Sequence, residues 1–183
     1  MPLVNARYKR ANPDWLRAGS PAVFAESVSK LLASSDLAIA ATGVELAADI
    51  ALDAGDVVTS LTFVVGGTAA GTPTAGYAVL RDAAGAKLVQ TADFGSTARA
   101  ANTAYTVALT SAYQVTATGL YRVGISFTAS TVPTLRGVSL ANAAVTGVGR
   151  ANAVTHGSSV GAVAPATVAT PTTVFAIPYF LVS

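Results

Sequence analysis

Residues 57–82 read VVTSLTFVVGGTAAGTPTAGYAVLRD, and this stretch decides the fold. Its first nine residues alternate, which predicts a β-strand with four side chains on one face: Val57, Thr59, Leu61 and Phe63. The final run, GYAVLRD, has the aromatic and branched apolar content of a second strand. Glycines and a proline between the two runs are typical of a loop. We therefore expect two strands connected through GGTAAGTPT.

Strand patterns continue on both sides of this stretch. Residues 44–52, VELAADIAL, alternate and lead into a turn, AGD, at 54–56. Residues 87–91, KLVQT, follow the turn AAGA and predict a hairpin with residues 76–82. Further strands are expected over 104–110, 119–129 and 173–182. Short strands at this spacing predict an all-β fold, an antiparallel β-sandwich.

The last third of the chain has weaker patterns. A short strand is expected near Val138–Leu140, whereas residues 153–173, rich in Gly, Thr and Pro, are expected to form a long loop. Pro178 cannot donate a backbone hydrogen bond. The final strand is therefore expected at a sheet edge or with a bulge.

The sandwich is expected to span residues 43–183, after an extended N-terminal arm over residues 1–42. Within the arm, residues 21–34 fit one short helix, because Ser20 can cap it and Pro21 suits its first position. Helical spacing also relates its apolar residues, which are Phe24, Val28, Leu31 and Leu32. An extended segment crossing the sandwich would use the same apolar residues, so both alternatives stay open.

Composition favours a soluble, ordered domain. Charged residues make up 11% of the 183 residues and hydrophobic residues 52%, which argues against disorder. The net charge of +2 comes from residues 1–20, where Arg7, Lys9, Arg10 and Arg17 exceed Asp14 by three charges. The N-terminus lacks the apolar run of a secretory signal, and the charge-free residues 151–183 contain three prolines, which suits no membrane helix.

The spacing of Gly66 and Gly71 resembles that of a phosphate-binding loop. That motif requires a lysine and a hydroxyl after the second glycine, and a helix after both. Here Thr72 and Pro73 occupy those positions and a strand pattern follows. We interpret the segment as a structural connection and expect no nucleotide or other cofactor.

A literal G-x-S-x-G occurs at residues 157–161, beside His156. A nucleophile elbow needs a strand before the serine, a helix after it and a base from later in the chain. Residues after Ser159 cannot form a stable helix, and the chain has no later histidine. We expect no hydrolase here and no enzymatic activity.

Metal and carboxylate chemistry are also poorly supported. The chain has no cysteine and one histidine, which excludes the usual zinc sites, and Asp49, Asp53 and Asp56 lack the spacing of a calcium loop. We expect the aspartates of DAGD (53–56) to accept backbone hydrogen bonds in a turn. Asp82 and Asp93 remain as a glycosidase pair only by elimination.

Tyrosines could form a platform for a sugar or a receptor. The available ones are Tyr77, Tyr105, Tyr113, Tyr121 and Tyr179. Each lies in or beside an expected strand, where aromatic side chains pack well. Packing is therefore the favoured interpretation.

Several ordered blocks between about residues 45 and 137 carry a family resemblance. They are AGD before VTSLTF, the loop GTAAGTPT, a strand ending in LRD, TGLYRVGI and VPTLRG. Together they resemble jelly-roll-like virion structural proteins of actinobacterial tailed bacteriophages, such as decoration and minor tail proteins. The resemblance implies a jelly-roll-like sandwich and a structural role in the virion.

These observations lead to one expected function and one alternative. The expected function is a non-enzymatic capsid decoration protein, assembled in the host cytoplasm and docked on other virion proteins through its arm by Tyr8, Lys9, Arg10, Trp15 and Arg17. The alternative is a minor tail or fibre module that binds a host glycan or receptor through residues 153–172. We expect a homo-oligomer, a trimer, with no nucleic-acid or membrane partner.

Overall fold

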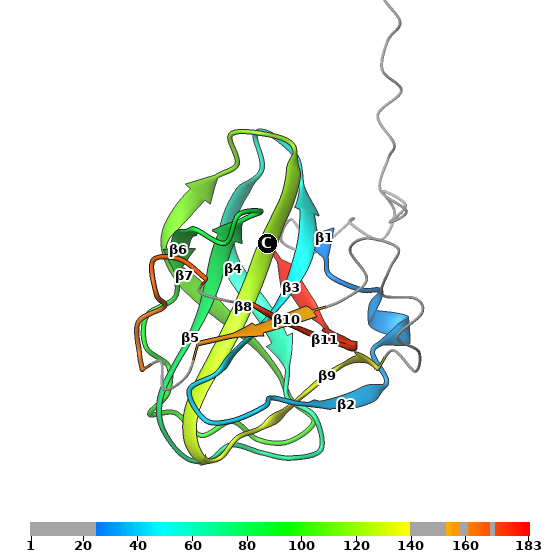
Figure 1. The fold of residues 1–183 in the computed structure, drawn as a ribbon, viewed down its shortest axis with the longest axis vertical. Coiled ribbons are helices and arrows are strands. Elements are labelled where there is room, and N and C mark those ends of the chain that lie inside the picture. Colours follow the sequence, from blue (N-terminus) through cyan, green and yellow to red (C-terminus); the bar gives the residue numbers. More distant parts are fainter. Residues whose placement is uncertain (1–24, 140–152, 158–160, 169–170) are drawn as a thin grey trace, which may run out of the picture.

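The computed structural model describes residues 25–139, 153–157, 161–168 and 171–183. Within these ranges the chain forms strands and a single 3-10 turn, η2 (Lys30–Leu32), and no α-helix. The strands form three sheets in which every pairing is antiparallel (Figure 1). The predicted all-β antiparallel sandwich is confirmed, whereas the jelly-roll likeness remains a prediction.

The largest sheet has six strands in the order β11-β10-β3-β8-β5-β6. Its central pairings are long, because β8 contacts both β3 and β5 over most of its length. The strands are β11 (Thr172–Val174), β10 (Ala153–His156), β3 (Glu45–Leu52), β8 (Gly119–Thr131), β5 (Gly71–Asp82) and β6 (Lys87–Gln90). Pairing of β5 with β6 confirms the predicted hairpin.

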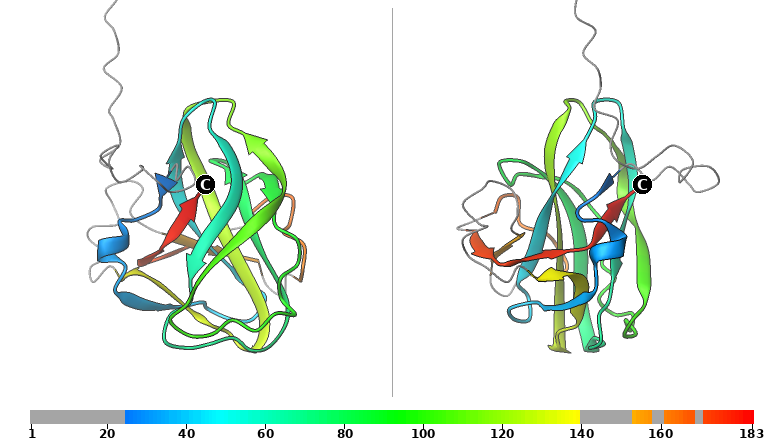
Figure 2. Two further views of the ribbon diagram at one scale, coloured as in Figure 1. Left: turned by 180° about the vertical axis from the view of Figure 1, so that it is seen from behind. Right: turned by 90° about the vertical axis from the view of Figure 1, so that its right-hand side faces the viewer.

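A four-stranded sheet packs opposite the central strands of the six-stranded sheet. Its order is β1-β13-β4-β7, and Figure 2 (left) shows β4 and β7 side by side from the outside. The strands are β1 (Ala25–Glu26), β13 (Phe180–Val182), β4 (Val57–Val64) and β7 (Ala104–Gln114). A third sheet, in the order β12-β9-β2, contains β12 (Ala176–Pro178), β9 (Thr134–Ser139) and β2 (Ser35–Ala38).

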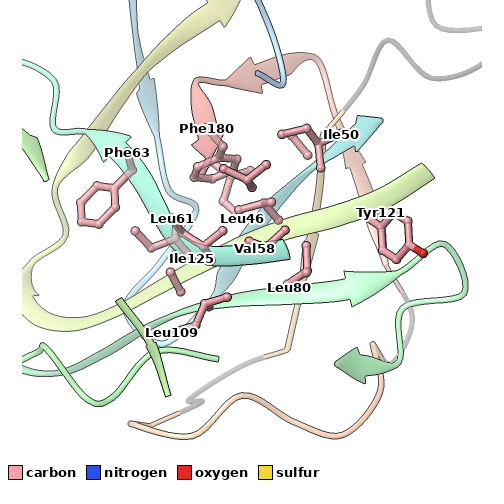
Figure 3. Packing of buried hydrophobic residues seen from close by; sticks show 14 of the residues in the cluster. Leu46, Ile50, Val58, Leu61, Phe63, Leu80, Leu109, Tyr121, Ile125 and Phe180 are labelled. Atoms are coloured by element: carbon pink, nitrogen blue, oxygen red, sulfur yellow. The ribbon is translucent and has the colours of Figure 1, made fainter. Parts of the chain in front are cut away.

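The hydrophobic core lies between the two larger sheets. Side chains from β3, β4, β5, β8 and β13 meet there, as Figure 3 shows for Leu46, Leu61, Leu80, Ile125 and Phe180. Alternation along β3 explains why this face is apolar: Leu46, Ala48, Ile50 and Leu52 all belong to the core cluster. The strand pattern of residues 44–52 is thus the pattern of one buried face.

One face assignment was wrong because β4 is irregular. Leu61 and Phe63 are buried as predicted, but Val57 and Thr59 are exposed and Val58 is buried instead. The register of β4 with β7 shifts between Val58 and Ser60, which moves the earlier residues to the opposite face. In this bulge the amides of Thr59 and Ser60 donate to the carbonyl of Ser183.

The single strand predicted over residues 173–182 is three short strands. They are β11, β12 and β13, and each belongs to a different sheet, so this segment ties all three sheets together. Pro178 ends β12, which is an edge strand of the three-stranded sheet, as its lack of an amide proton predicted.

The region expected as a long loop is also partly a strand. Residues Ala153–His156 form β10 between β3 and β11. A four-residue strand has too few positions for a periodic signal, and its pairing with β3 joins residues more than a hundred positions apart in the sequence. The strand expected near Val138 is present as β9, extended toward Thr134.

An α-helix over residues 21–34 is not formed in the described part of that segment. Ala25 and Glu26 pair with β13, and the Ser27 side chain donates to the Pro178 carbonyl and accepts from the Phe180 amide. Pairing with β13 occupies backbone groups that helical hydrogen bonds would need, so only η2 is helical. Strands β1 and β2 thus join the sheets within residues 25–38, ahead of the expected domain start at residue 43.

Candidate functional site

The arm residues predicted to bind a partner lie outside the described residues. They are Tyr8, Lys9, Arg10, Trp15 and Arg17. What the structure does describe is the point where the arm joins the sandwich: Ala25 pairs with Val182 at the edge of the four-stranded sheet. A partner bound by the arm would therefore be linked to the sandwich at this edge.

Three successive amides of the glycine-rich loop before β5 already donate to protein acceptors. The amide of Gly66 donates to the Thr134 carbonyl, that of Gly67 to the Asp36 carboxylate, and that of Thr68 to the Thr134 hydroxyl. A Cβ on Gly67 would lie 2.6 Å from Asp36 Oδ2, so the glycine lets this carboxylate approach the backbone. Asp36 also pairs with Arg136 at 3.0 Å.

A row of polar side chains crosses four strands of the six-stranded sheet on its outer face. Tyr77 on β5 pairs with Ser126 on β8, Ser126 with Glu45 on β3, and Glu45 with His156 on β10. All four side chains are buried. The row thus brings a phenol, a hydroxyl, a carboxylate and an imidazole together on one buried face of the sheet.

Glu45 is the centre of the row. Its carboxylate accepts hydrogen bonds from Arg81 Nε at 2.9 Å, from Arg81 Nη2 at 2.8 Å and from the Tyr77 hydroxyl at 2.8 Å. His156 Nε2 lies 2.9 Å from Glu45 Oε1. The Glu45 and Arg81 side chains have no exposed surface, so this is a fully buried, bidentate ion pair.

A glycine makes this pair geometrically possible. Glu45 must reach across β8 to meet Arg81 on β5, and Gly124 lies beneath its side chain. A Cβ at Gly124 would collide with the Glu45 carboxylate. The absence of a side chain at this position is therefore part of the site.

Residues 161–168, which we call the cover segment, close the outer face over this network. Arg81 Nη1 donates to the Pro165 carbonyl at 2.9 Å, and the Lys87 amide donates to the Ala166 carbonyl at 2.8 Å. Ala164 packs with Tyr77 and Val79 in a small apolar cluster. In Figure 1 the orange cover segment runs beside β5 and β6.

Protonation in the network follows from burial and from charge. Burial by itself would raise the pKa of Glu45, but the hydrogen bonds from His156 and Arg81 and the positive charge of Arg81 outweigh it, and the pKa is lowered. The pKa of Tyr77 is raised, first by burial and then by the negative charge of Glu45. The carboxylate is therefore ionised and the phenol protonated at neutral pH.

The network offers little to a substrate. The imidazole of His156 contacts Glu45 inside the sheet, in a strand rather than in a nucleophile elbow. Ser159 of the G-x-S-x-G match lies outside the described residues. Buried, mutually compensated charges of this kind stabilise a defined packing and do not by themselves transfer groups.

The other carboxylates considered as candidate sites in the sequence accept hydrogen bonds from backbone amides. Asp56 accepts from the Asp53 amide, as the turn prediction required. Asp82 accepts from the Ala86 amide, and Asp93 accepts from two amides, those of Gly76 and Gly95. No group of three or more metal-ligating side chains is found in the described ranges.

Packing accounts for the tyrosines. Tyr77, Tyr121 and Tyr179 are buried, and Tyr105 and Tyr113 pack against the core. The favoured interpretation is confirmed: the described tyrosines form no common exposed platform.

No role was assigned to Glu45 or Arg81 from the sequence. The available signal was their position, since each is a charged residue inside a strongly apolar strand, VELAADIAL and GYAVLRD. Two opposite charges in such positions indicate a buried pair. Their register could not be read from sequence because it depends on β8 lying between them.

No family model matches the chain, and no curated protein matches it either. Among the helices of the described residues, none is long and apolar enough to span a membrane. The class defined by fold and site is thus an all-β sandwich with a buried structural polar network.

Proposed function

We propose that this chain is a structural component of a bacteriophage virion, a capsid decoration protein docked through its basic N-terminal arm. The observation that supports the proposal is that charged side chains of the sandwich pair with one another. Glu45 pairs with Arg81, Asp49 with Arg122, and Asp36 with Arg136, each across strands of a sheet. Each pair joins two strands, and the Glu45–Arg81 pair is fully buried, so these groups hold the sandwich together, as expected of an assembly component.

The arm and its junction supply the contact surface in this proposal. The arm holds the chain's excess positive charge together with Tyr8 and Trp15, residues that favour buried interfaces. Five residues beyond Glu26, η2 presents Leu31 and Leu32, which are 89% and 62% exposed. Adjacent exposed leucines support a contact surface that extends from the arm onto the sandwich.

The minor tail or fibre alternative has less support. Binding of a host glycan through tyrosines would depend on Tyr105 and Tyr113, because Tyr77, Tyr121 and Tyr179 are buried. The cover segment, which belongs to the region assigned to that role, is bonded to β5 and β6. We therefore retain the capsid role as the proposal.

Co-sedimentation with purified capsids tests it. A variant lacking residues 1–20 keeps every strand of the described ranges, the first of which, β1, begins at Ala25. We expect the full chain to bind and this variant to lose most of its affinity. A matched variant, Lys87→Gln, removes one positive charge on β6, outside the arm and away from η2, and should bind normally. Undiminished binding without residues 1–20 would refute the anchoring role.

A further inference from the structure

Arg99 lies at the end of the sandwich that also contains the glycine-rich loop. It belongs to the connection between β6 and β7, residues 91–103. The Ala70 amide donates to the Arg99 carbonyl, and the Asn102 amide donates to the Gly66 carbonyl. Two connections far apart in sequence thus hold the backbone of Arg99 in place.

Two aromatic rings hold its guanidinium. The guanidinium carbon lies 5.1 Å from the ring centroid of Phe94 and 4.7 Å from that of Tyr105. Both rings stack on Phe63, each at 5.8 Å between centroids, so the clamp is built into the core. Such contacts stabilise the cation over the ring faces but leave its N–H groups without acceptors.

The donors of Arg99 are largely unused. Nε is buried and has no hydrogen-bond partner, and Nη2 makes one long bond of 3.5 Å to the Phe94 carbonyl. Nη1 makes no hydrogen bond to a described residue. The terminal edge of the guanidinium, formed by Nη1 and Nη2, therefore has unused N–H groups on a side chain held between two rings.

Arg99 also differs from the other arginines of the described residues. Arg81, Arg122 and Arg136 each pair with a carboxylate, whereas no described carboxylate pairs with Arg99. The residue is 8% exposed, and burial lowers its pKa from the ordinary value, although a guanidinium stays charged at any physiological pH. A buried cation normally has a counter-ion.

We propose that the free edge of Arg99 is a binding site for a carboxylate group, with Phe94 and Tyr105 fixing the guanidinium in position. The planar N–H edge of arginine matches the two oxygens of a carboxylate. A phosphate dianion is less suited, because the nearby Arg136 is already paired with Asp36 and supplies no second charge. This site goes beyond the virion role and does not depend on it.

The carboxylate can be a free small acid or an acidic side chain of a neighbouring protein. The test is a titration of the full ¹⁵N-labelled chain, followed through the Nε–H resonance of Arg99 at constant ionic strength. Acetate is one probe and N-acetylglutamate amide is the other. Arg99→Lys assigns the resonance by removing it; should that variant not fold, Tyr105→Leu assigns it by removing the ring shift.

We expect a saturable shift of the Arg99 resonance, with no saturable shift for Arg81 or Arg122, whose Nε groups already donate to Glu45 and Asp49. Saturation by both probes identifies an acidic side chain as a competent ligand, and saturation by acetate alone identifies a free acid. Shifts that are absent, or linear and equal at all three arginines, would overturn the proposal. Tighter binding of inorganic phosphate than of acetate would overturn the assignment to carboxylates.

Discussion

The carboxylate of Glu45 on β3 accepts two hydrogen bonds from the guanidinium of Arg81 on β5, across the intervening strand β8. This contact joins three strands of the six-stranded sheet. Through Nη1 it also reaches the Pro165 carbonyl of the cover segment. The pair therefore connects the sheet to the segment that closes its outer face.

Removing one partner of this pair should be costly. Arg81→Met leaves the buried Glu45 carboxylate without its counter-ion, and we expect a loss of about 3–5 kcal/mol in the free energy of unfolding. Adding Glu45→Gln to Arg81→Met should recover part of the loss, because the unpaired charge is gone. Denaturant unfolding of both single variants and the double variant measures the coupling. Losses that simply add would contradict a direct pair.

Acid should weaken the fold through Glu45. Its folded-state pKa is lowered, so its contribution is present above the unfolded value of about 4.3 and is lost as pH falls toward the folded value. The stability gap between the native chain and Glu45→Gln should stay constant near pH 5 and shrink below about pH 4. Chemical unfolding over this range checks it. A gap that widens in acid would mean that burial, not pairing, controls the carboxyl group.

Alkali should act through Tyr77 in the opposite pH range. Its folded-state pKa is raised by burial and by Glu45, so its contribution is present below the unfolded value of about 10 and is lost as pH rises. Tyr77→Phe should cost about 1 kcal/mol at neutral pH, the value of one hydrogen bond. The difference from the native chain should shrink above pH 10. Phenolate absorbance, with Tyr77→Phe as the reference, should show that Tyr77 ionises only on unfolding.

Gly124 should tolerate no side chain. A Cβ there would collide with Glu45, so Gly124→Ala should lose about 1–3 kcal/mol of stability. Gly119→Ala, in the same strand, is the matched control because nothing lies within 4 Å of its Cβ position, and its change should stay within about 0.5 kcal/mol. Thermal unfolding of the two variants compares them directly. Equal losses would show that glycine acts only through backbone propensity.

Sequence patterns were sufficient where a strand is long and one face is apolar. The alternation of residues 44–52 and the hairpin of residues 76–91 were predictable, since period and turn chemistry act locally. Pro178 at a sheet edge was predictable for the same reason, because the constraint lies in one residue.

Features that depend on distant partners were not predictable. Three-residue strands such as β11 have no period, so the division of residues 172–182 among three sheets left no local signal. The bulge at Thr59 arises where the Ser183 carbonyl accepts from β4, a contact more than a hundred residues away in sequence. The candidate site shows the same limit. The sequence contains the charges of Glu45 and Arg81, but it does not show that they pair, because the pairing depends on the register of β8 between their strands.

The central claim is a structural role in the virion, and counting this chain in purified particles tests it most directly. Quantitative mass spectrometry should find it at a copy number comparable with that of the major capsid protein, as expected for decoration of the shell. A few copies per particle would favour the tail alternative over capsid decoration. Absence of the chain from intact particles would contradict the account.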